Sequence, residues 1–244
     1  MHVSLAPEAL FNVGPITVTN SMLTAVITTL LIGGGLVWAA HQLKVKPAGG
    51  FAGIYEALAD MVLGQAEQVL GSREKALQYF PFLATLFLFI LGNNLLAQIP
   101  GFNVLTLNGE PVLRSVTADL NATTALALIS VILTQIYAIR ALGVVGNLKR
   151  YFHGNAMMKG VGVLEIFLEF TRVISFSFRL FGNIFAGEVL LIVISTLLPV
   201  LGPVPFWGLE LFVAFIQAYV FTMLTMIFIG IGTTPIQEHG AEAH

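Results

Sequence analysis

Five long apolar segments, separated by short polar ones, dominate the hydrophobic pattern of this chain. Each is long enough to cross the hydrocarbon core of a membrane, which takes about 20 apolar residues in a helix. The predicted spans are residues 21–40, 80–101, 120–139, 161–198 and 205–231. The pattern therefore predicts an all-α integral membrane protein that forms a single membrane domain over residues 1–244.

A sixth segment, residues 51–70, has a helical pattern with two different faces. Its apolar side chains recur at helical spacing on one face, whereas Glu56, Asp60 and Glu67 cluster on the other. This pattern is typical of an amphipathic helix that lies at the cytoplasmic membrane interface. The alternative is a helix packed against a partner subunit, because an acidic face is not attracted to anionic lipid.

The fourth span is too long to stand upright in a membrane. As one helix, residues 161–198 would extend about 57 Å, against a hydrocarbon core of about 30 Å. The helix must therefore break, for example near Gly182 or Gly187, or lie strongly tilted. Tilt is the preferred interpretation, with protein beside the helix, because its polar groups would otherwise face lipid.

The composition agrees with a membrane protein. Of the 244 residues, 57% are hydrophobic and 10% are charged, whereas a soluble domain carries about 25% charged residues. The chain has no cysteine, which excludes disulfides, thiolate metal sites and cysteine nucleophiles. It has no nucleotide-binding motif and no metal-ligand spacing, so we expect no cofactor, no metal, no bound nucleotide and no nucleic-acid partner.

The distribution of basic residues predicts the orientation of the spans. With the N-terminus outside, eight of the 11 Lys and Arg residues fall in cytoplasmic segments, namely Lys44, Lys46, Arg73, Lys75, Arg140, Lys149, Arg150 and Lys159. Arg114 would then lie outside, and Arg172 and Arg179 within a span. Such an excess of inward-facing basic residues is typical of membrane proteins. We therefore expect a periplasmic N-terminus, a cytoplasmic C-terminus and location in a bacterial inner membrane.

Arg179 lies near the middle of the fourth span. An arginine near the bilayer centre costs at least about 2.5–3.5 kcal/mol, and a guanidinium group cannot escape this penalty by losing its proton. No acidic residue follows Arg179 at three or four positions along the helix. Because intramembrane charges commonly mark ion paths or proton relays, we predict that Arg179 is functional.

Arg179 shares one stripe of its helix with four other polar residues. At helical spacing these are Glu165, Glu169, Arg172 and Asn183. Glu169 and Arg172 are three residues apart, so the simplest interpretation is a local ion pair near the cytoplasmic end. The sequence does not assign roles to Glu165, Glu169 and Arg172.

Carboxyl groups inside the last two spans indicate a proton path. Glu188 lies across the fourth span from Arg179, and Glu210 and Gln217 share one face of the fifth. Buried carboxyl groups suit the uptake and release of protons; the alternative is an acid fully hydrogen-bonded within a helix interface. Asp119 and Asn121 begin the third span, where they are candidates for the same path, although Asp119 is equally a candidate N-cap.

The sequence around these residues closely resembles subunit a of F-type ATP synthases. The matching runs are Arg179-Leu-Phe-Gly-Asn-Ile-Phe-Ala-Gly-Glu188, Phe215-Ile-Gln-Ala-Tyr-Val-Phe-Thr-Met-Leu-Thr, Asn93-Asn-Leu-Leu, Pro100-Gly-Phe and Thr117-Ala-Asp-Leu-Asn121. The resemblance covers essentially the whole chain. The first run is the most specific because it joins a rare intramembrane charge to fixed neighbours.

This resemblance implies the stator half of a rotary proton path. The last two helices would form a long, tilted hairpin against a ring of c subunits, and Arg179 would be the essential charge that faces the ring carboxylates. The remaining path residues by resemblance are Glu188 and Glu210 in the outer of two aqueous half-channels, Gln217 beside the arginine, and Asn183 and Asn121 near the path. The implied partners are the c-ring, the peripheral-stalk b subunits, the remainder of the ATP synthase and membrane lipid. ATP would be made by other subunits, so the chain would not be an enzyme on its own.

Two other classes of protein are alternatives. A stand-alone secondary transporter with a midplane substrate site would typically contain two internal repeats with broken helices, and no such repeat is visible. A purely structural scaffold would not need Arg179 in the middle of a span.

Overall fold

Six α-helices form the fold in the part of the chain that the structure describes. This computed structural model describes residues 7–13, 16–42, 50–99, 106–107, 110–152, 156–199 and 201–234. The helices are α1 (Asn20–Gln42), α2 (Phe51–Leu70), α3 (Arg73–Ala97), α4 (Leu120–Phe152), α5 (Ala156–Leu197) and α6 (Pro203–Thr233). All except α2 are long and apolar enough to cross a membrane. The predicted all-α membrane fold is confirmed.

Short strands and one 3-10 helix connect these helices. Strands β1 (Ala9–Val13) and β2 (Ile16–Thr19) form an antiparallel pair before α1, and β3 (Thr106–Leu107) and β4 (Glu110–Pro111) form another between α3 and α4. The 3-10 helix η1 (Val116–Ala118) then leads into α4. The hydrophobic pattern did not predict these elements, because each has only two to five residues. Segments this short contain too few positions for a periodic apolar pattern to be recognised.

Several helices extend beyond the apolar segments that predicted them. Helix α3 begins at Arg73, whereas the predicted span began at residue 80. The prediction missed the first turns because they are polar and therefore lie outside the apolar segment. Ser72 caps this end, where its Oγ accepts a hydrogen bond from the Lys75 backbone N–H at 3.2 Å. Helix α6 begins with Pro203, a residue favoured in the first turn because its missing N–H would have no partner there.

Helix α4 changes direction at Gly143. This residue has a φ of 75°, in the left-handed region that glycine adopts without steric penalty. In a straight helix, Gln135 and Asn147 would lie about 18 Å apart along the axis. The bend brings them together, and Asn147 Nδ2 donates a hydrogen bond to Gln135 Oε1 at 3.4 Å.

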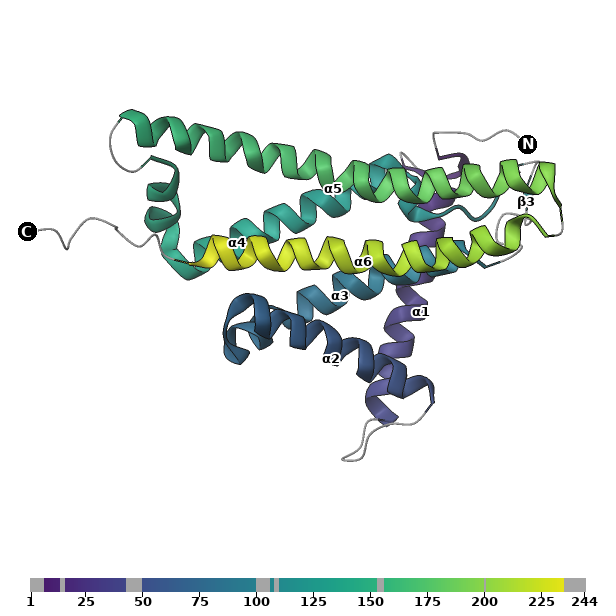
Figure 1. The fold of residues 1–244 in the computed structure, drawn as a ribbon, viewed down its shortest axis with the longest axis horizontal. Helices are drawn as coiled ribbons and strands as arrows, with labels where there is room; N and C mark the ends of the chain where they lie inside the picture. Colours follow the sequence, from purple (N-terminus) through teal and green to yellow (C-terminus); the bar gives the residue numbers. More distant parts are fainter. Residues whose placement is uncertain are drawn as a thin grey trace, which may run out of the picture.

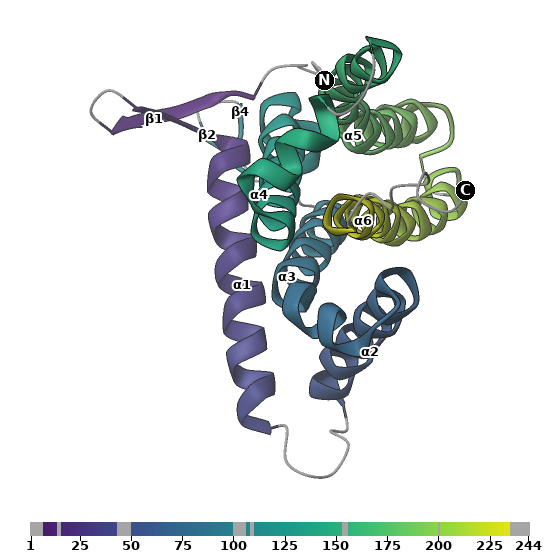
Figure 2. The same ribbon diagram turned by 90° about the vertical axis from the view of Figure 1, so that its left-hand side faces the viewer.

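Helices α5 and α6 run side by side and are strongly inclined to α1. In Figure 1 both lie along the long axis of the molecule, while α1 crosses them steeply. Figure 2 shows α5 and α6 nearly end-on and α1 along its full length. Helix α5 is continuous over 42 residues, so Gly182 and Gly187 do not break it. The inclination and the unbroken length agree with the tilted interpretation.

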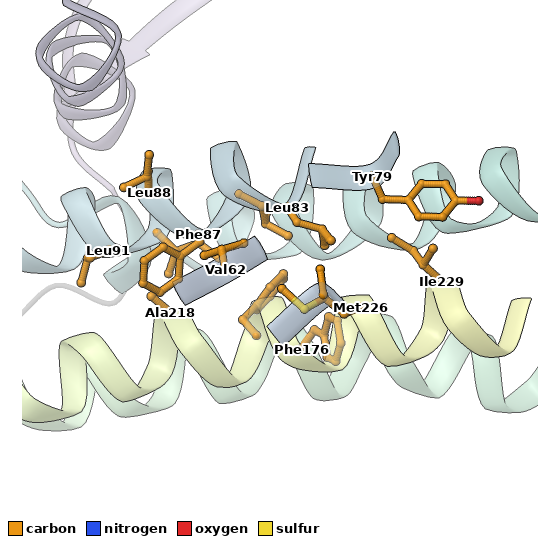
Figure 3. Close-up of a cluster of buried hydrophobic side chains, with 14 of the residues drawn as sticks. Val62, Tyr79, Leu83, Phe87, Leu88, Leu91, Phe176, Ala218, Met226 and Ile229 are labelled. Atoms are coloured by element: carbon orange, nitrogen blue, oxygen red, sulfur yellow. The ribbon is translucent and has the colours of Figure 1, made fainter. Parts of the chain in front are cut away.

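The apolar core lies between α2, α3 and α6, with a contribution from α5. Leu83 and Phe87 of α3 are fully buried at its centre. Val62 of α2, Met226 of α6 and Phe176 of α5 pack around them (Figure 3). The apolar face of α2 is therefore largely covered by helices of this same chain, which fixes the amphipathic helix against the bundle.

Candidate functional site

Asn183 and Gln217 connect the two inclined helices. Asn183 Nδ2, on α5, donates a hydrogen bond to Gln217 Oε1, on α6, at 2.6 Å. Gln217 is only 3% exposed, and its Nε2 has no hydrogen-bond partner among the described residues. Since Asn183 follows Arg179 by one helical turn, this amide pair fixes the contact between α5 and α6 next to the arginine.

Arg179 is half-buried, and its guanidinium group turns back along its own helix. Its Nη2 donates a hydrogen bond to Ser175 Oγ at 3.2 Å, and its Cζ lies 5.9 Å from the centre of the Phe176 ring. Among the described residues, no carboxylate forms an ion pair with Arg179. In the described part of the chain, this charge therefore contacts neutral groups of its own helix.

Glu210 is buried between α5 and α6. It is 5% exposed, and its Oε2 has no hydrogen-bond partner in the described part of the chain. Its carboxyl group lies directly against Gly187 of α5, where any Cβ atom would collide with it. Gly187 is therefore the residue that makes room for this acid. The sequence suggested it only as a possible break in the helix, so this contribution to the site was missed.

Glu188 lies beside this contact. It follows Gly187 in α5 and interacts electrostatically with both Glu210 and Arg114. The structure thus brings together the two carboxyl groups that the sequence assigned to one path. It also adds Arg114, which the sequence identified only as the basic residue on the outer side.

Asp119 connects α1 to the start of α4. Its Oδ2 accepts a hydrogen bond from Ser21 Oγ at 2.6 Å, and its Oδ1 accepts one from the backbone N–H of Asn121 at 2.9 Å. The second bond is that of an N-cap, so the N-cap alternative is confirmed. The side chain of Asn121 is exposed. A place for either residue in a proton path stays a prediction.

Asn94 is a further buried polar residue, which joins three elements near Glu210. Its Oδ1 accepts a hydrogen bond from Thr117 Oγ1 at 2.8 Å, and its Nδ2 donates one to the carbonyl oxygen of Ala214 at 3.1 Å. Ala214 lies one turn after Glu210 in α6. The paired asparagines at the end of the second predicted span were the sequence signal for this contact.

The polar residues nearer the start of α5 contact other helices. Glu169 accepts a hydrogen bond from Gln135 Nε2 of α4. Arg172 places its Cζ 4.0 Å from the centre of the Phe228 ring of α6, a cation–π geometry. Both side chains thus have partners on neighbouring helices, and the ion pair between them stays a prediction.

The described residues contain no cluster of three or more His, Cys, Asp or Glu side chains that could hold a metal ion. The ionisable groups at the site are instead set along the interface of two long helices. The fold and this site define an integral membrane protein with charged and carboxyl side chains inside its spans.

The chain belongs to the ATP synthase A chain family, whose model matches residues 22–230. It is 32% identical to ATP synthase subunit a of Moorella thermoacetica over 223 residues. This alignment covers 91% of this chain and 94% of that protein. It is 34% identical over 204 residues to ATP synthase subunit a of Campylobacter jejuni, in an alignment that covers 82% of this chain and 83% of that protein. Its identity to ATP synthase subunit a 2 of Syntrophotalea carbinolica is 35% over 208 residues, in an alignment that covers 84% of this chain and 82% of that protein.

The resemblance drawn from the sequence motifs is therefore confirmed. The chain is a membrane part of an ATP synthase, and its partners include other subunits of that complex. This membership fits the expectation that it is not an enzyme on its own.

Proposed function

We propose that this chain is the proton-channel stator subunit of a rotary F-type ATP synthase. It provides two aqueous half-channels, separated by Arg179, that couple proton flow to the rotation of a c-ring. The observation that carries this proposal is the state of Arg179: a permanent charge inside a membrane helix, with no ion-pair partner among the described residues. Family membership favours this role over a stand-alone transporter.

Arg179 acts on carboxylates that arrive on the ring. A fixed cation stabilises the ionised form of a passing carboxyl group and so drives off its proton. The same charge repels protons and prevents a direct leak between the half-channels. Three aromatic side chains of α5 support a partner along this helix, since Phe167, Phe170 and Phe178 are 64%, 65% and 58% exposed. Large exposed apolar surfaces of this kind mark lipid or protein contacts.

The outer half-channel leads to Glu188 and Glu210. A cavity of about 400 Å³ at the ends of α3, α5 and α6 supports this path. Its lining includes Leu191, one turn after Glu188, and Trp207, one turn before Glu210. Water in this cavity would be close to both acids, which makes it suited to deliver protons to them.

The remaining residues and partners of the proposal follow from the family motif. Gln217 and Asn183 fix the helix contact beside Arg179, and Asp119 and Asn121 lie near the outer path. The c-ring covers α5 and α6, and peripheral-stalk b subunits hold the stator. The whole chain acts as one membrane domain of the bacterial inner membrane, with a periplasmic N-terminus and a cytoplasmic C-terminus.

The test is proton-driven ATP synthesis by the complete complex in lipid vesicles. Arg179→Ala should abolish synthesis while the complex still assembles. The control is Arg73→Ala, because Arg73 is an exposed arginine paired with Glu67 at 2.9 Å, and it should retain near-normal rates. Normal synthesis by Arg179→Ala would overturn the proposal.

Purification in mild detergent separates this function from the transporter alternative. The chain should travel with a small, very apolar, ring-forming protein. A lone monomer that still moves a solute across vesicle membranes would favour a transporter.

A further inference from the structure

A second cavity, of about 660 Å³, lies where three helices end at one end of the molecule. Its lining comes from the end of α2, the first turn of α3 and the last turns of α6. Figure 1 shows the turn between α2 and α3 at the same end of the molecule as the yellow end of α6. The cavity that supports the outer path lies at the opposite ends of α3 and α6. This second cavity is therefore a separate site, and its volume is that of a small-molecule site.

The lining of this cavity changes from apolar to polar along α6. Ile227 and Ile231 contribute apolar side chains, and Thr233 and Thr234 follow at the end of the helix. From Ile227 to Thr234 is about 10 Å along the helix axis. The last two residues of α2 add further apolar side chains. A ligand that fits this lining has an apolar part and a polar part.

Among the described residues, Lys75 is the charged side chain of the lining. It is exposed, and its ammonium group forms no ion pair with another described residue. The nearby Arg73 is paired with Glu67 at 2.9 Å, and neither Arg73 nor the exposed Glu74 lines the cavity. Lys75 lies in the first turn of α3, where the helix dipole is also positive. The charge at the polar end of the cavity therefore favours an anion.

The two threonines of the lining use their hydroxyl protons within α6. Thr233 Oγ1 donates a hydrogen bond to the carbonyl oxygen of Ile229 at 2.8 Å, and Thr234 Oγ1 donates one to that of Gly230 at 2.7 Å. Each hydroxyl group has one proton, whereas an ammonium group has three N–H donors. Recognition of an anionic oxygen in this cavity therefore depends mainly on Lys75.

The cavity lies at the level where two membrane spans end. Helices α3 and α6 are long and apolar enough to cross a membrane, and Lys75 and Thr233 belong to their terminal turns on this side. Ile231 is 50% exposed, so the apolar part of the lining can contact lipid tails. Basic groups between membrane helices at this level bind the headgroups of anionic lipids.

We propose that this cavity binds one phospholipid with an anionic headgroup. The lipid phosphate lies at the ammonium group of Lys75, and the first part of one acyl chain lies along Ile227 and Ile231, with the remainder in the bilayer. Ile227 follows Gln217 by ten residues, which is about 15 Å along α6. The lipid site is therefore separate from the contact beside Arg179 and does not depend on the proposed proton path.

The experiment uses photoactivatable lipid and the complete synthase. The complex is placed in phosphatidylcholine vesicles that contain a small share of phosphatidylglycerol with a photoactivatable group near the top of one acyl chain. After illumination, labelled peptides are identified by mass spectrometry, and label should appear on residues 227–234. Photoactivatable phosphatidylcholine in place of the phosphatidylglycerol should label this segment about fivefold less, because its headgroup has no net negative charge.

Two kinds of variant test the headgroup and the chain separately. Lys75→Gln should lower labelling by phosphatidylglycerol about fivefold, and Lys75→Arg should keep it within about twofold of the unchanged complex. Gly230→Leu places a side chain in the cavity and should lower labelling by both lipids. A Cβ at position 230 would meet Leu70 and the carbonyl oxygen of Val69 at 3.5 and 3.8 Å, which are ordinary contact distances. The helices therefore need not move to accept it.

Matched controls change similar residues outside the cavity. Arg140→Gln removes an exposed basic residue of α4, and Gly64→Leu adds the same side chain to α2 at a position where a Cβ meets no atom within 4 Å. Both variants should label like the unchanged complex. Excess glycerophosphate in the water should also leave labelling unchanged, and displacement of the label by it would overturn the lipid in favour of a soluble phosphate ester.

Three further results would overturn the proposal. The first is equal labelling by the two lipids, and the second is undiminished labelling of Lys75→Gln. The third is the absence of label from residues 227–234, as when another subunit of the complex covers the cavity. None of these results bears on ATP synthesis by Arg179→Ala, which tests the proposed function on its own.

Discussion

Gly187 of α5 leaves the space that the carboxyl group of Glu210 of α6 occupies. Any side chain at position 187 would place its Cβ within the carboxyl group. The close approach of these two helices and the burial of the acid therefore depend on the same missing atom. Glu188, the next residue, is brought to Glu210 by this contact.

Substitution of Gly187 tests this relationship directly. Gly187→Ala should displace the Glu210 carboxyl group, destabilise the α5–α6 contact by about 1–3 kcal/mol and lower proton-driven ATP synthesis about tenfold or more. Synthesis in vesicles and thermal stability of the purified complex measure the two effects. The control is Gly64→Ala, where a Cβ meets no atom within 4 Å.

A second substitution should partly reverse the first. Glu210→Asp shortens the acid by one methylene group and frees space near position 187. The double variant Gly187→Ala/Glu210→Asp should be more stable than Gly187→Ala alone. Equal or lower stability would show that the overlap at position 187 is not what destabilises the contact.

Glu210→Gln tests whether this carboxyl group exchanges protons. Glutamine has nearly the same shape but no titratable proton, so the substitution should slow proton passage and change the dependence of ATP synthesis on outer pH. The matched control is Glu74→Gln, an exposed acid in the first turn of α3. An unchanged rate and pH profile would make Glu210 a structural acid.

The hydrogen bond between Asn183 and Gln217 should make these residues act as a unit. Asn183→Leu and Gln217→Leu each remove the same bond, so each should slow ATP synthesis. The double variant should be no slower than the more severe single variant. Rates that fall multiplicatively would show that the two side chains act independently.

Asp119 should stabilise the start of α4. Asp119→Ala removes the N-cap and the bond to Ser21, which should destabilise the chain by about 1–2 kcal/mol. Asp119→Asn keeps a capping oxygen and should assemble normally. Thermal stability of the complex measures the first effect. A lower synthesis rate in fully assembled Asp119→Asn would show that its charge, beyond the cap, serves the proton path.

The hydrophobic pattern predicted the spans well because length and apolar content are properties of continuous segments. It was less successful at helix ends. Helix α3 begins at Arg73 with a polar first turn that Ser72 caps, and α4 continues past residue 139 to Phe152, beyond its predicted end. The bend at Gly143 also gives no hydrophobic signal, since it depends on a single backbone conformation.

The sequence alone determined the membrane class and the family, and it predicted a function for Arg179, because each follows from a local feature: apolar length, a motif, or a charge in a costly place. Only the tertiary structure decided which polar groups meet. The contact of Gly187 with Glu210, and the hydrogen bond between Asn183 and Gln217, link segments that lie apart in the chain. Helix periodicity fixes the face on which a side chain lies, but the packing of helices fixes what that face contacts.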